Sequence, residues 1–465
     1  MSSLWLDRPR EHRSDELPAD GRVEDLVVGA GLTGLVTALL LARAGRQVAV
    51  VEAREAGAVT TGRTTAKVSQ LQATKLSSML RLQPEEVVRG YVEANGGGLE
   101  WLRSYCADRG VPCQDRRAVT FAAEPDERDK VREEYDAARS VGLAVDWQDT
   151  LDLPFPVHGA VVLDDQAQLD PVALVDALVD DLREQGGTLH QGHRVVRVSK
   201  RGAPVVELDT GETLHAQHVV LATGTPVLDR GLHFAKVEPK RSYLLAFRDP
   251  APPELMCISA GSSTRSVRDV PGDEPVLLVG GSGHPVGRDP SPLAHYAELR
   301  EWAAEHFPEA EETHAWSAQD YGAYTGVPIV GPILPGMEQV FVATGYDKWG
   351  MASAVAAAET IAGSILGSSR TDHQAWTAPR RPTPPSVLEA CRINGEVVLS
   401  LVGGLTRVGK APLCTHLGGV LRWNDAESSW DCPLHGSRFA EDGTVLEGPA
   451  VRPLTGGEPP APAAG

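Results

Sequence analysis

Long apolar segments are missing from this sequence, and their absence excludes a large class of proteins. No stretch reaches the ~18 consecutive apolar residues that a helical membrane span requires. The first residues are polar, with Asp7, Arg8, Glu11 and Asp15 close together, and they lack the apolar core of a secretory signal. We therefore expect a cytoplasmic protein without a membrane span.

Cysteine is also scarce, with six residues in a chain of 465. This number is too small for a disulfide scaffold. The last two cysteines, Cys414 and Cys432, are each followed within a few residues by a histidine. That pairing favours metal binding over disulfide formation.

Basic residues are outnumbered by acidic ones, 44 to 63, which gives a formal net charge of -19. Nucleic-acid binding depends on clustered Lys and Arg, so we expect no nucleic-acid partner. The composition, 42% hydrophobic and 23% charged, is that of a folded globular protein. The length predicts two or three domains.

Patterns along the chain predict a discontinuous α/β body and a small C-terminal module. Residues 23–52 predict a strand, a glycine turn, a helix and a second strand, whereas residues 387–454 alternate short β-like runs with glycine turns. The predicted fold class is α/β (α+β), a Rossmann-type dinucleotide-binding domain with an inserted substrate domain, followed by a small all-β domain. The predicted units are an N-terminal extension (1–22), a body (23–366), a proline-rich linker (367–386), the C-terminal domain (387–455) and a tail (456–465). Within the body, the cofactor-binding parts are expected near 23–90, 156–225 and 320–366. The substrate-domain parts are expected near 91–155 and 226–319.

A glycine-rich turn marks the first candidate site. Gly29, Gly31 and Gly34 directly follow an apolar strand and open the predicted helix, with Leu32 and Thr33 between them. This arrangement lets the backbone approach a pyrophosphate at the positive end of the helix. Glu52 ends the next predicted strand, where an acid can bind the ribose hydroxyls. The sequence therefore predicts a dinucleotide site that favours an unphosphorylated ribose.

Three further segments resemble flavoproteins of the glycine oxidase and D-amino-acid oxidase superfamily. Residues 221–224 (LATG) are similar to the family's second nucleotide-contacting turn, and residues 342–351 are similar to its closing flavin motif. The loop 61–67 is similar to the segment that runs from the ribose towards the isoalloxazine, although a capped turn before a helix is the alternative. The resemblance implies this fold over about residues 22–366 and FAD as the cofactor. The residues predicted to bind it are Gly29, Gly31, Leu32, Thr33, Gly34, Glu52, Arg54, Arg63, Thr64, Thr65, Val195, Thr223, Gly224, Gly345, Lys348, Gly350 and Met351.

Two matched Cys and His pairs form the second candidate site. Cys414 and His416 lie in one short segment, and Cys432 and His435 lie in another. Two thiolates on one iron and two imidazoles on the other are the ligands of a Rieske [2Fe-2S] cluster, and residues 387–454 resemble Rieske domains. Structural zinc is the competing interpretation, although zinc fingers usually place both histidines on a helix. We expect thiolate cysteines, and histidines exposed at the tip of the domain.

The segment departs from the Rieske proteins of respiratory complexes at several positions. Gly419 and Leu434 stand where that subfamily has a bridging cysteine pair, so we expect no supporting disulfide. Ser437 can donate a hydrogen bond to a cluster sulfide, but Phe439 replaces a tyrosine donor. Because fewer donors to sulfur lower the potential, we expect a value in the lower or middle part of the range of about -150 to +300 mV.

The two predicted cofactors together indicate an oxidoreductase. A flavin accepts two electrons as hydride, whereas a [2Fe-2S] cluster passes one. We expect hydride transfer from a small organic substrate, an amine or amino acid by family resemblance, and single-electron transfer to an acceptor or from a donor that could be a protein. The alternative is an electron-transfer or redox-responsive protein without its own small substrate. A Rieske oxygenase would need a mononuclear iron on two histidines and a carboxylate, and we find no well-spaced set of this kind in the sequence.

Lys348 is the candidate catalytic residue, because it lies in the segment expected beside the flavin. It could activate oxygen, stabilise reduced flavin or bind a substrate carboxylate, and a surface lysine is the alternative. Four further residues flank the same region and are predicted to shape the substrate cavity, with packing in the core as the alternative: Trp316, Gln319, Asp320 and Tyr346.

Overall fold

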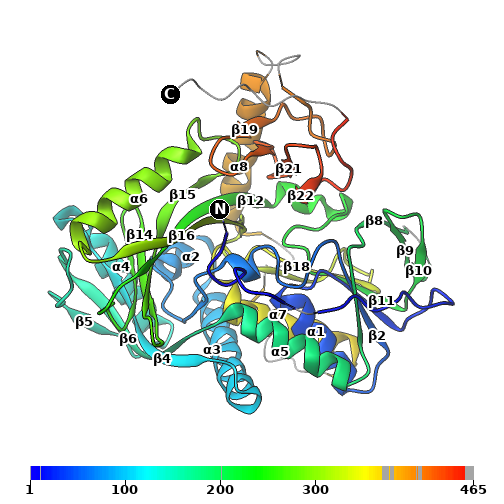
Figure 1. Cartoon of the computed structure of the whole chain (residues 1–465), viewed down its shortest axis with the longest axis horizontal. Coiled ribbons are helices and arrows are strands. Elements are labelled where there is room, and N and C mark those ends of the chain that lie inside the picture. Colours follow the sequence, from blue (N-terminus) through cyan, green and yellow to red (C-terminus); the bar gives the residue numbers. More distant parts are fainter. Residues whose placement is uncertain are drawn as a thin grey trace.

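The computed structural model describes residues 2–10, 12–199, 202–368, 376–377, 382–404, 406 and 411–455. Two large sheets with their helices form the body, and a small sheet lies above them at the top of Figure 1. The predicted tail and most of the predicted linker lie outside the described residues. Within the described part of the chain, no helix is both long and apolar enough to cross a bilayer.

The first sheet has six strands, of which all but β17 run parallel to their neighbours. Its central strands are nearly continuous apolar runs because both faces of the sheet are covered. Helices pack on one face, and a small antiparallel sheet formed by residues 195–215 packs on the other. Helix α1 packs against both α5 and α7. The strands, in sheet order, are β17 (Ile329–Pro332), β18 (Val340–Thr344), β11 (His218–Leu221), β1 (Asp25–Val28), β2 (Val48–Glu52) and β7 (Thr188–Gln191), and the helices are α1 (Leu32–Arg43), α5 (Pro171–Glu184) and α7 (Gly350–Ile365).

This sheet confirms the strand–turn–helix–strand pattern predicted for residues 23–52. The Asp170 side chain caps α5 by accepting hydrogen bonds from the first backbone N–H groups of the helix, and Pro171 lies in its first turn. A separate three-stranded antiparallel sheet follows β7 in the chain. It consists of β8 (Val195–Val198), β9 (Val205–Leu208) and β10 (Thr213–His215).

The second large sheet has nine strands and is mainly antiparallel. It contains β6, because β6 pairs along most of its length with β4. The sequence had instead predicted that this segment belongs to the cofactor-binding part at 156–225. Its strands are β16 (Glu311–Ala323), β12 (Val237–Arg248), β15 (Val276–Pro285), β14 (Arg265–Val270), β13 (Met256–Ser259), β4 (Cys113–Phe121), β6 (Ala160–Leu169), β3 (Lys67–Val68) and β5 (Asp146–Gln148). The helices outside the six-stranded sheet are α2 (Lys75–Leu82), α3 (Glu85–Arg109), α4 (Arg128–Ser140) and α6 (Pro292–His306), with the short turns η1 (Thr61–Arg63), η2 (Pro125–Glu127) and η3 (Arg230–Ala235).

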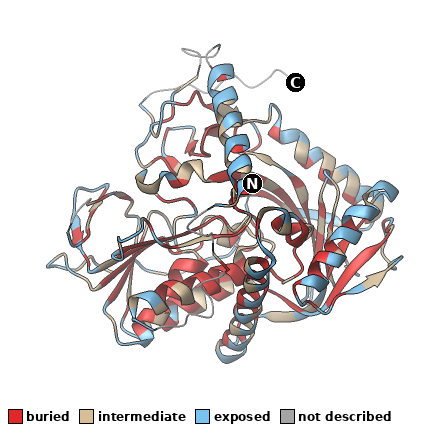
Figure 2. Cartoon of the chain, turned by 180° about the vertical axis from the view of Figure 1, so that it is seen from behind, coloured by how far each residue is buried: buried red, intermediate tan, exposed pale blue. Residues whose placement is uncertain are grey.

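The C-terminal module is a four-stranded antiparallel sheet, but it does not begin at residue 387 as predicted. Helix α8 (Pro384–Gly404) occupies that segment, and much of its surface is exposed (Figure 2). Pro384 and Pro385 suggested an extended linker, yet proline is tolerated in the first turn of a helix. The strands are β19 (Arg422–Asn424), β20 (Ser429–Asp431), β21 (Arg438–Ala440) and β22 (Val445–Glu447).

Candidate active site and cluster pocket

A cavity lies at the carboxyl ends of β1, β2 and β11 and is closed on its other side by the nine-stranded sheet. The turn between β1 and α1 forms one wall. Gly29 has a φ of +103°, and a Cβ atom there would lie 2.5 Å from the carbonyl oxygen of Ala222. A Cβ at Gly34 would lie 1.9 Å from the carbonyl oxygen of Gly29. Only glycine therefore allows this close approach of turn, helix and neighbouring strand.

Glu52 is fixed at the edge of the same cavity. Its carboxylate accepts hydrogen bonds from the backbone N–H groups of Ala30 at 2.8 Å and of Arg54 at 2.9 Å. These bonds orient the acid beside the glycine turn. Arg54, Arg63 and Arg194 also line the cavity, which gives it a cationic side suited to phosphate.

The segment that closes the cavity has an unusual backbone. Gly345, Asp347 and Lys348 all have positive φ, at 86°, 52° and 72°. The backbone N–H of Lys348 donates to the carboxylate of Asp320. This turn aims the first residues of α7, Gly350 and Met351, into the cavity, where no side chain of the residue preceding the helix caps its free N–H groups.

The structure brings nearly all of the predicted cofactor residues together. Every one lines the cavity except Gly34, which packs against Gly29, and Gly345, where a Cβ would lie 2.8 Å from the Cβ of Ala323. Of the four flanking candidates, Asp320 and Tyr346 line the cavity. Trp316 is fully buried in the core, and Gln319 lies under the C-terminal module.

Lys348 projects into the cavity, close to Gly283 and Ser242. Enclosure by protein lowers the pKa of its ammonium group, while Asp347 acts in the opposite direction. Lys240 and Lys75 both form ion pairs with Asp347, at 3.2 Å each. Among the described residues, the Nζ of Lys348 has no hydrogen bond or ion pair of its own.

Sequence reasoning missed several cavity residues. Lys67 lines the cavity and donates hydrogen bonds of 2.7 Å to the carbonyl oxygen of Cys257 and the hydroxyl of Ser266. Burial lowers its pKa to about 7. Its place at the end of the loop 61–67 was the available signal. Glu447 and Gly448, from the C-terminal module, also line the cavity, and no local pattern could have indicated them.

The four predicted metal ligands lie on two loops with the same hydrogen-bonding pattern. The N–H of Gly418 donates to the carbonyl of Cys414 at 2.9 Å, and the N–H of Gly436 donates to the carbonyl of Cys432 at 3.1 Å. Both glycines have positive φ, 72° and 78°. A Cβ at Gly419 would lie 2.7 Å from the side chain of Leu434, so leucine fills the position where a bridging disulfide would lie.

The two histidines are not exposed, contrary to the prediction. Their rings lie 5.3 Å apart, and the ring of Phe234, in η3 of the body, packs against both at 5.1 Å and 4.7 Å. The side chain of His416 is only 6% exposed, and its Nε2 lies 2.6 Å from a carboxylate oxygen of Asp229. The module therefore docks its ligand tip onto the body, which covers it.

These residues fit a [2Fe-2S] cluster with two cysteine and two histidine ligands. Cys414 and Cys432 are buried side by side, with thiols close enough to hydrogen-bond. The Nδ1 of His435 is buried without any hydrogen-bond partner, as expected for a nitrogen that binds metal. Because the Nε2 of His416 is engaged by Asp229, its Nδ1 remains as the free ring nitrogen.

A buried ion network joins the module to the body. Arg241 of β12 is 1% exposed and forms an ion pair of 3.0 Å with Glu447. Arg438 forms pairs with Glu447 at 3.1 Å and with Asp431 at 3.0 Å. Because these charges are enclosed, each depends on its partners for compensation.

Comparisons with known proteins agree with both sites. The profile of a family described as FAD dependent oxidoreductase matches residues 26–363, and that of the Rieske [2Fe-2S] domain matches residues 396–457. A Rieske 2Fe-2S iron-sulfur protein of Bacillus subtilis, YhfW, is 27% identical over 94% of each chain. A cytochrome b6-f complex iron-sulfur subunit of a Nostoc species is 50% identical over 11% of this chain and 28% of its own.

Solved structures with the same fold cover the body. Glycine oxidase from Geobacillus kaustophilus has a TM-score of 0.65 and 19% identity, covering 78% of this chain and 99% of its own. L-amino acid deaminase from Proteus vulgaris has a TM-score of 0.64 and 16% identity, covering 80% and 100%. The glycine turn, the cavity and the paired cluster loops thus have one common explanation: this chain belongs to the FAD dependent oxidoreductase family and carries a C-terminal Rieske domain, so it is an oxidoreductase whose cofactors are FAD and a [2Fe-2S] cluster.

Proposed function

We propose that this protein oxidises a small amine or amino acid at the flavin and passes the electrons singly through the Rieske cluster to an acceptor. The observation that carries the proposal is the shared cavity wall. Glu447 and Gly448 of the Rieske domain line the same cavity as the glycine turn and Lys348. A bound flavin accepts two electrons as hydride, and a [2Fe-2S] cluster passes one.

Lys348 is our choice for substrate recognition. Its ammonium faces the cavity beside the N-terminus of α7, and the neighbouring Lys240 and Lys75 are already paired with Asp347. An unpaired cation that lines a cavity can bind a carboxylate. This charge favours an amino acid over a simple amine as the substrate.

Asp320 lines the same cavity and holds Lys348 in place. Its carboxylate accepts the backbone N–H of Lys348 and thereby supports the positive-φ turn before α7. Lys67, with a pKa near 7, is hydrogen-bonded to protein acceptors on the other side of the cavity. Its proton can be held or released there near neutral pH.

Hydrogen bonds connect the cavity to the cluster loops. Tyr321 lines the cavity, and its hydroxyl donates to the carbonyl of Gly448 at 3.0 Å. The amide of Gln319 donates both to the Tyr321 hydroxyl at 2.9 Å and to the carbonyl of Gly436, next to His435, at 2.8 Å. This packed connection supports electron transfer within one molecule.

Anaerobic spectroscopy of the purified holoprotein tests the proposal. We expect flavin absorption bands and, after reduction, an EPR signal of low average g from the Rieske cluster. Each of a panel of amino acids and amines is then added, and we expect one class to bleach the flavin and to produce the cluster signal without dithionite.

Other results would point elsewhere. Bleaching of the flavin without any cluster signal would contradict transfer between the two centres. If no member of the panel, nor NAD(P)H, reduces the flavin but a reduced protein donor does so rapidly, the protein is an electron carrier without its own small substrate.

A further inference from the structure

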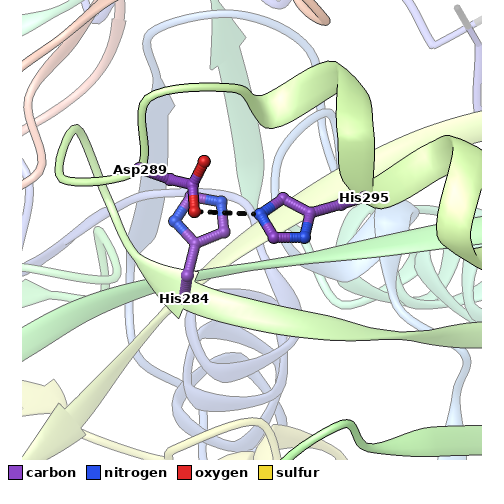
Figure 3. A group of neighbouring side chains, drawn as sticks. All are labelled: His284, Asp289 and His295. Atoms are coloured by element: carbon purple, nitrogen blue, oxygen red, sulfur yellow. Dashed lines mark ion pairs between the residues drawn. The ribbon is translucent and has the colours of Figure 1, made fainter.

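A second group of potential metal ligands lies outside both sites. His284 near the end of β15, Asp289 in the following loop and His295 in α6 point towards one another (Figure 3). One ligand atom from each lies within 4.8 Å of the others. Two histidines and a carboxylate form a set that the sequence analysis did not find, because a strand, a loop and a helix each contribute one member.

We propose that His284, Asp289 and His295 bind one divalent transition-metal ion through the two Nε2 atoms and a carboxylate oxygen of Asp289. The proposal does not depend on the function proposed for the flavin and the cluster. Imidazole and carboxylate ligands in this number suit zinc, iron(II) or manganese(II), with the remaining positions taken by water.

The tautomer of His284 suits this role. Its Nδ1 lies 2.9 Å from the carbonyl oxygen of Pro285, which can only accept, so Nδ1 carries the proton. The Nε2 atom therefore holds the lone pair, to which the Tyr243 hydroxyl donates at 2.9 Å without an ion. A metal-bound histidine commonly donates its other N–H to a backbone carbonyl in this way.

Asp289 and His295 lie at a spacing that a shared ion could bridge. One oxygen of Asp289 accepts the N–H of Ser291 at 2.8 Å, and the other lies 3.2 Å from the Nε2 of His295. That nitrogen is buried, yet it makes no aligned hydrogen bond. Two ligand atoms that each bind one ion at about 2.1 Å lie about 3.0 to 3.4 Å apart, which matches this spacing.

The ligand side chains are partly accessible to solvent. A carboxylate oxygen of Glu298 lies 3.9 Å from the Nδ1 of His295, beyond hydrogen-bond distance. The side chains of Asp289 and His295 are 24% and 19% exposed, which leaves room for water ligands.

The same loop holds the Rieske domain in place. Arg288 donates to the carbonyl of Pro433 at 3.1 Å, and a Cβ at Gly287 would lie 2.8 Å from the backbone nitrogen of Pro433. Pro433 directly follows the cluster ligand Cys432. A bound ion would therefore clamp the loop against which the second cluster loop rests.

Metal analysis of the full-length holoprotein tests the site. The protein is equilibrated with zinc, or anaerobically with iron(II), and weakly bound ions are removed before elemental analysis. We expect about one zinc, or a third iron, per chain beyond the two irons of the cluster. We expect H295Q and D289N to lose this ion and the control H306Q, on the same helix, to keep it.

Flavin absorption and the cluster EPR signal show whether each variant is intact. D289N hardly changes the side-chain volume and should fold. If H295Q does not fold, the metal content of D289N alone tests the site. No metal above the two cluster irons in the wild-type protein, or an unchanged extra ion in an intact D289N variant, would overturn the proposal and leave a plain Asp289–His295 ion pair.

Discussion

At the scale of single residues, the two centres use charge in opposite ways. Lys348 presents an unpaired ammonium to the flavin cavity, where a substrate can neutralise it. His416 instead has its outer nitrogen bound by Asp229, so a fixed anion lies next to a cluster ligand. The ammonium group of Lys348 is available to bind an anion, whereas the carboxylate of Asp229 is placed to influence the reduction potential of the cluster.

Replacing Lys348 by methionine should weaken substrate binding more than it slows the chemistry. Loss of a hydrogen bond to a charged group costs about 1.5 to 3 kcal/mol, so KM should rise about 10- to 150-fold. Steady-state kinetics with the substrate found in the panel measures this change. Lys348→Arg should restore part of the affinity, and Lys130→Met, on the exposed surface of α4, should behave like wild type. An unchanged KM in an intact Lys348→Met protein would exclude carboxylate binding by this residue.

Replacing Asp229 by asparagine should raise the reduction potential of the cluster. The carboxylate makes the His416 ligand more electron-rich, which stabilises the oxidised cluster. Loss of about 1.4 kcal/mol of this stabilisation corresponds to about 60 mV for one electron. EPR-monitored redox titration measures the shift, with Asp442→Asn on the module surface as the control. A potential that stays constant or falls would contradict a tuning role.

At the scale of elements, helix N-termini organise the molecule. Helices α1 and α7 direct theirs into the flavin cavity, where their free N–H groups can meet anionic parts of the cofactor. Helix α2 has a different partner. The N–H groups of Leu76 and Ser77 donate to the buried carboxylate of Glu134 from α4, at 3.0 Å and 2.9 Å.

Gly34→Ala should prevent FAD binding by pushing α1 away from the turn. The added Cβ would lie 1.9 Å from the carbonyl oxygen of Gly29. This clash cannot be relieved unless the turn or the helix moves. We expect protein purified without bound flavin, measured by the ratio of absorbance at flavin and protein wavelengths. Gly97→Ala is the matched control, because nothing lies within 4 Å of its added Cβ. Full flavin content in Gly34→Ala would show that the turn is not tightly packed in solution.

Glu134 should make stability depend on pH. Burial raises its pKa to about 7, against about 4.3 in an unfolded chain. Between these values the folded state binds more protons, so stability is lost as pH rises through this window. Relative to wild type, Glu134→Gln should gain about 2 kcal/mol between pH 5.5 and 7.5, measured from thermal unfolding at a series of pH values. A difference that is constant with pH would show that the carboxyl group does not titrate there.

At the scale of the whole molecule, the Rieske domain is an integral part of the body. Its ligand tip is covered by η3, its last strand lines the flavin cavity, and Arg241 of the body is enclosed among its acids. The two centres are thus held in one fixed arrangement by buried charges.

Arg241→Met should loosen this arrangement. Removing one partner of a buried ion pair costs about 3 to 5 kcal/mol, because Glu447 and Glu427 then lose a compensating charge. We expect a lower thermal midpoint and faster proteolysis of the whole chain. Arg248→Met, on the same strand with a side chain 52% exposed, should leave both unchanged. Equal behaviour of the two variants would refute a structural role for the network.

The features predicted correctly from the sequence are those encoded within short segments. The turn at Gly29 and each of the two cluster loops were recognisable from a short run of neighbouring residues. Helix α8 was not predicted, because its two initial prolines resembled a linker although proline is tolerated in the first turn of a helix.

Features that depend on distant contacts were not predictable. Glu447 reaches a cavity built mainly from residues hundreds of positions earlier. The histidines were expected to be exposed because nothing in their own segment indicates that Phe234 covers them. His284, Asp289 and His295 likewise meet only when β15 and α6 are in place.

The contribution of Glu447 and Gly448 to the cavity has a consequence for biosynthesis. Translation delivers these residues after the whole flavin-binding body, so the cavity of the nascent body lacks this part of its wall. The wall is complete only after the Rieske domain has folded and docked.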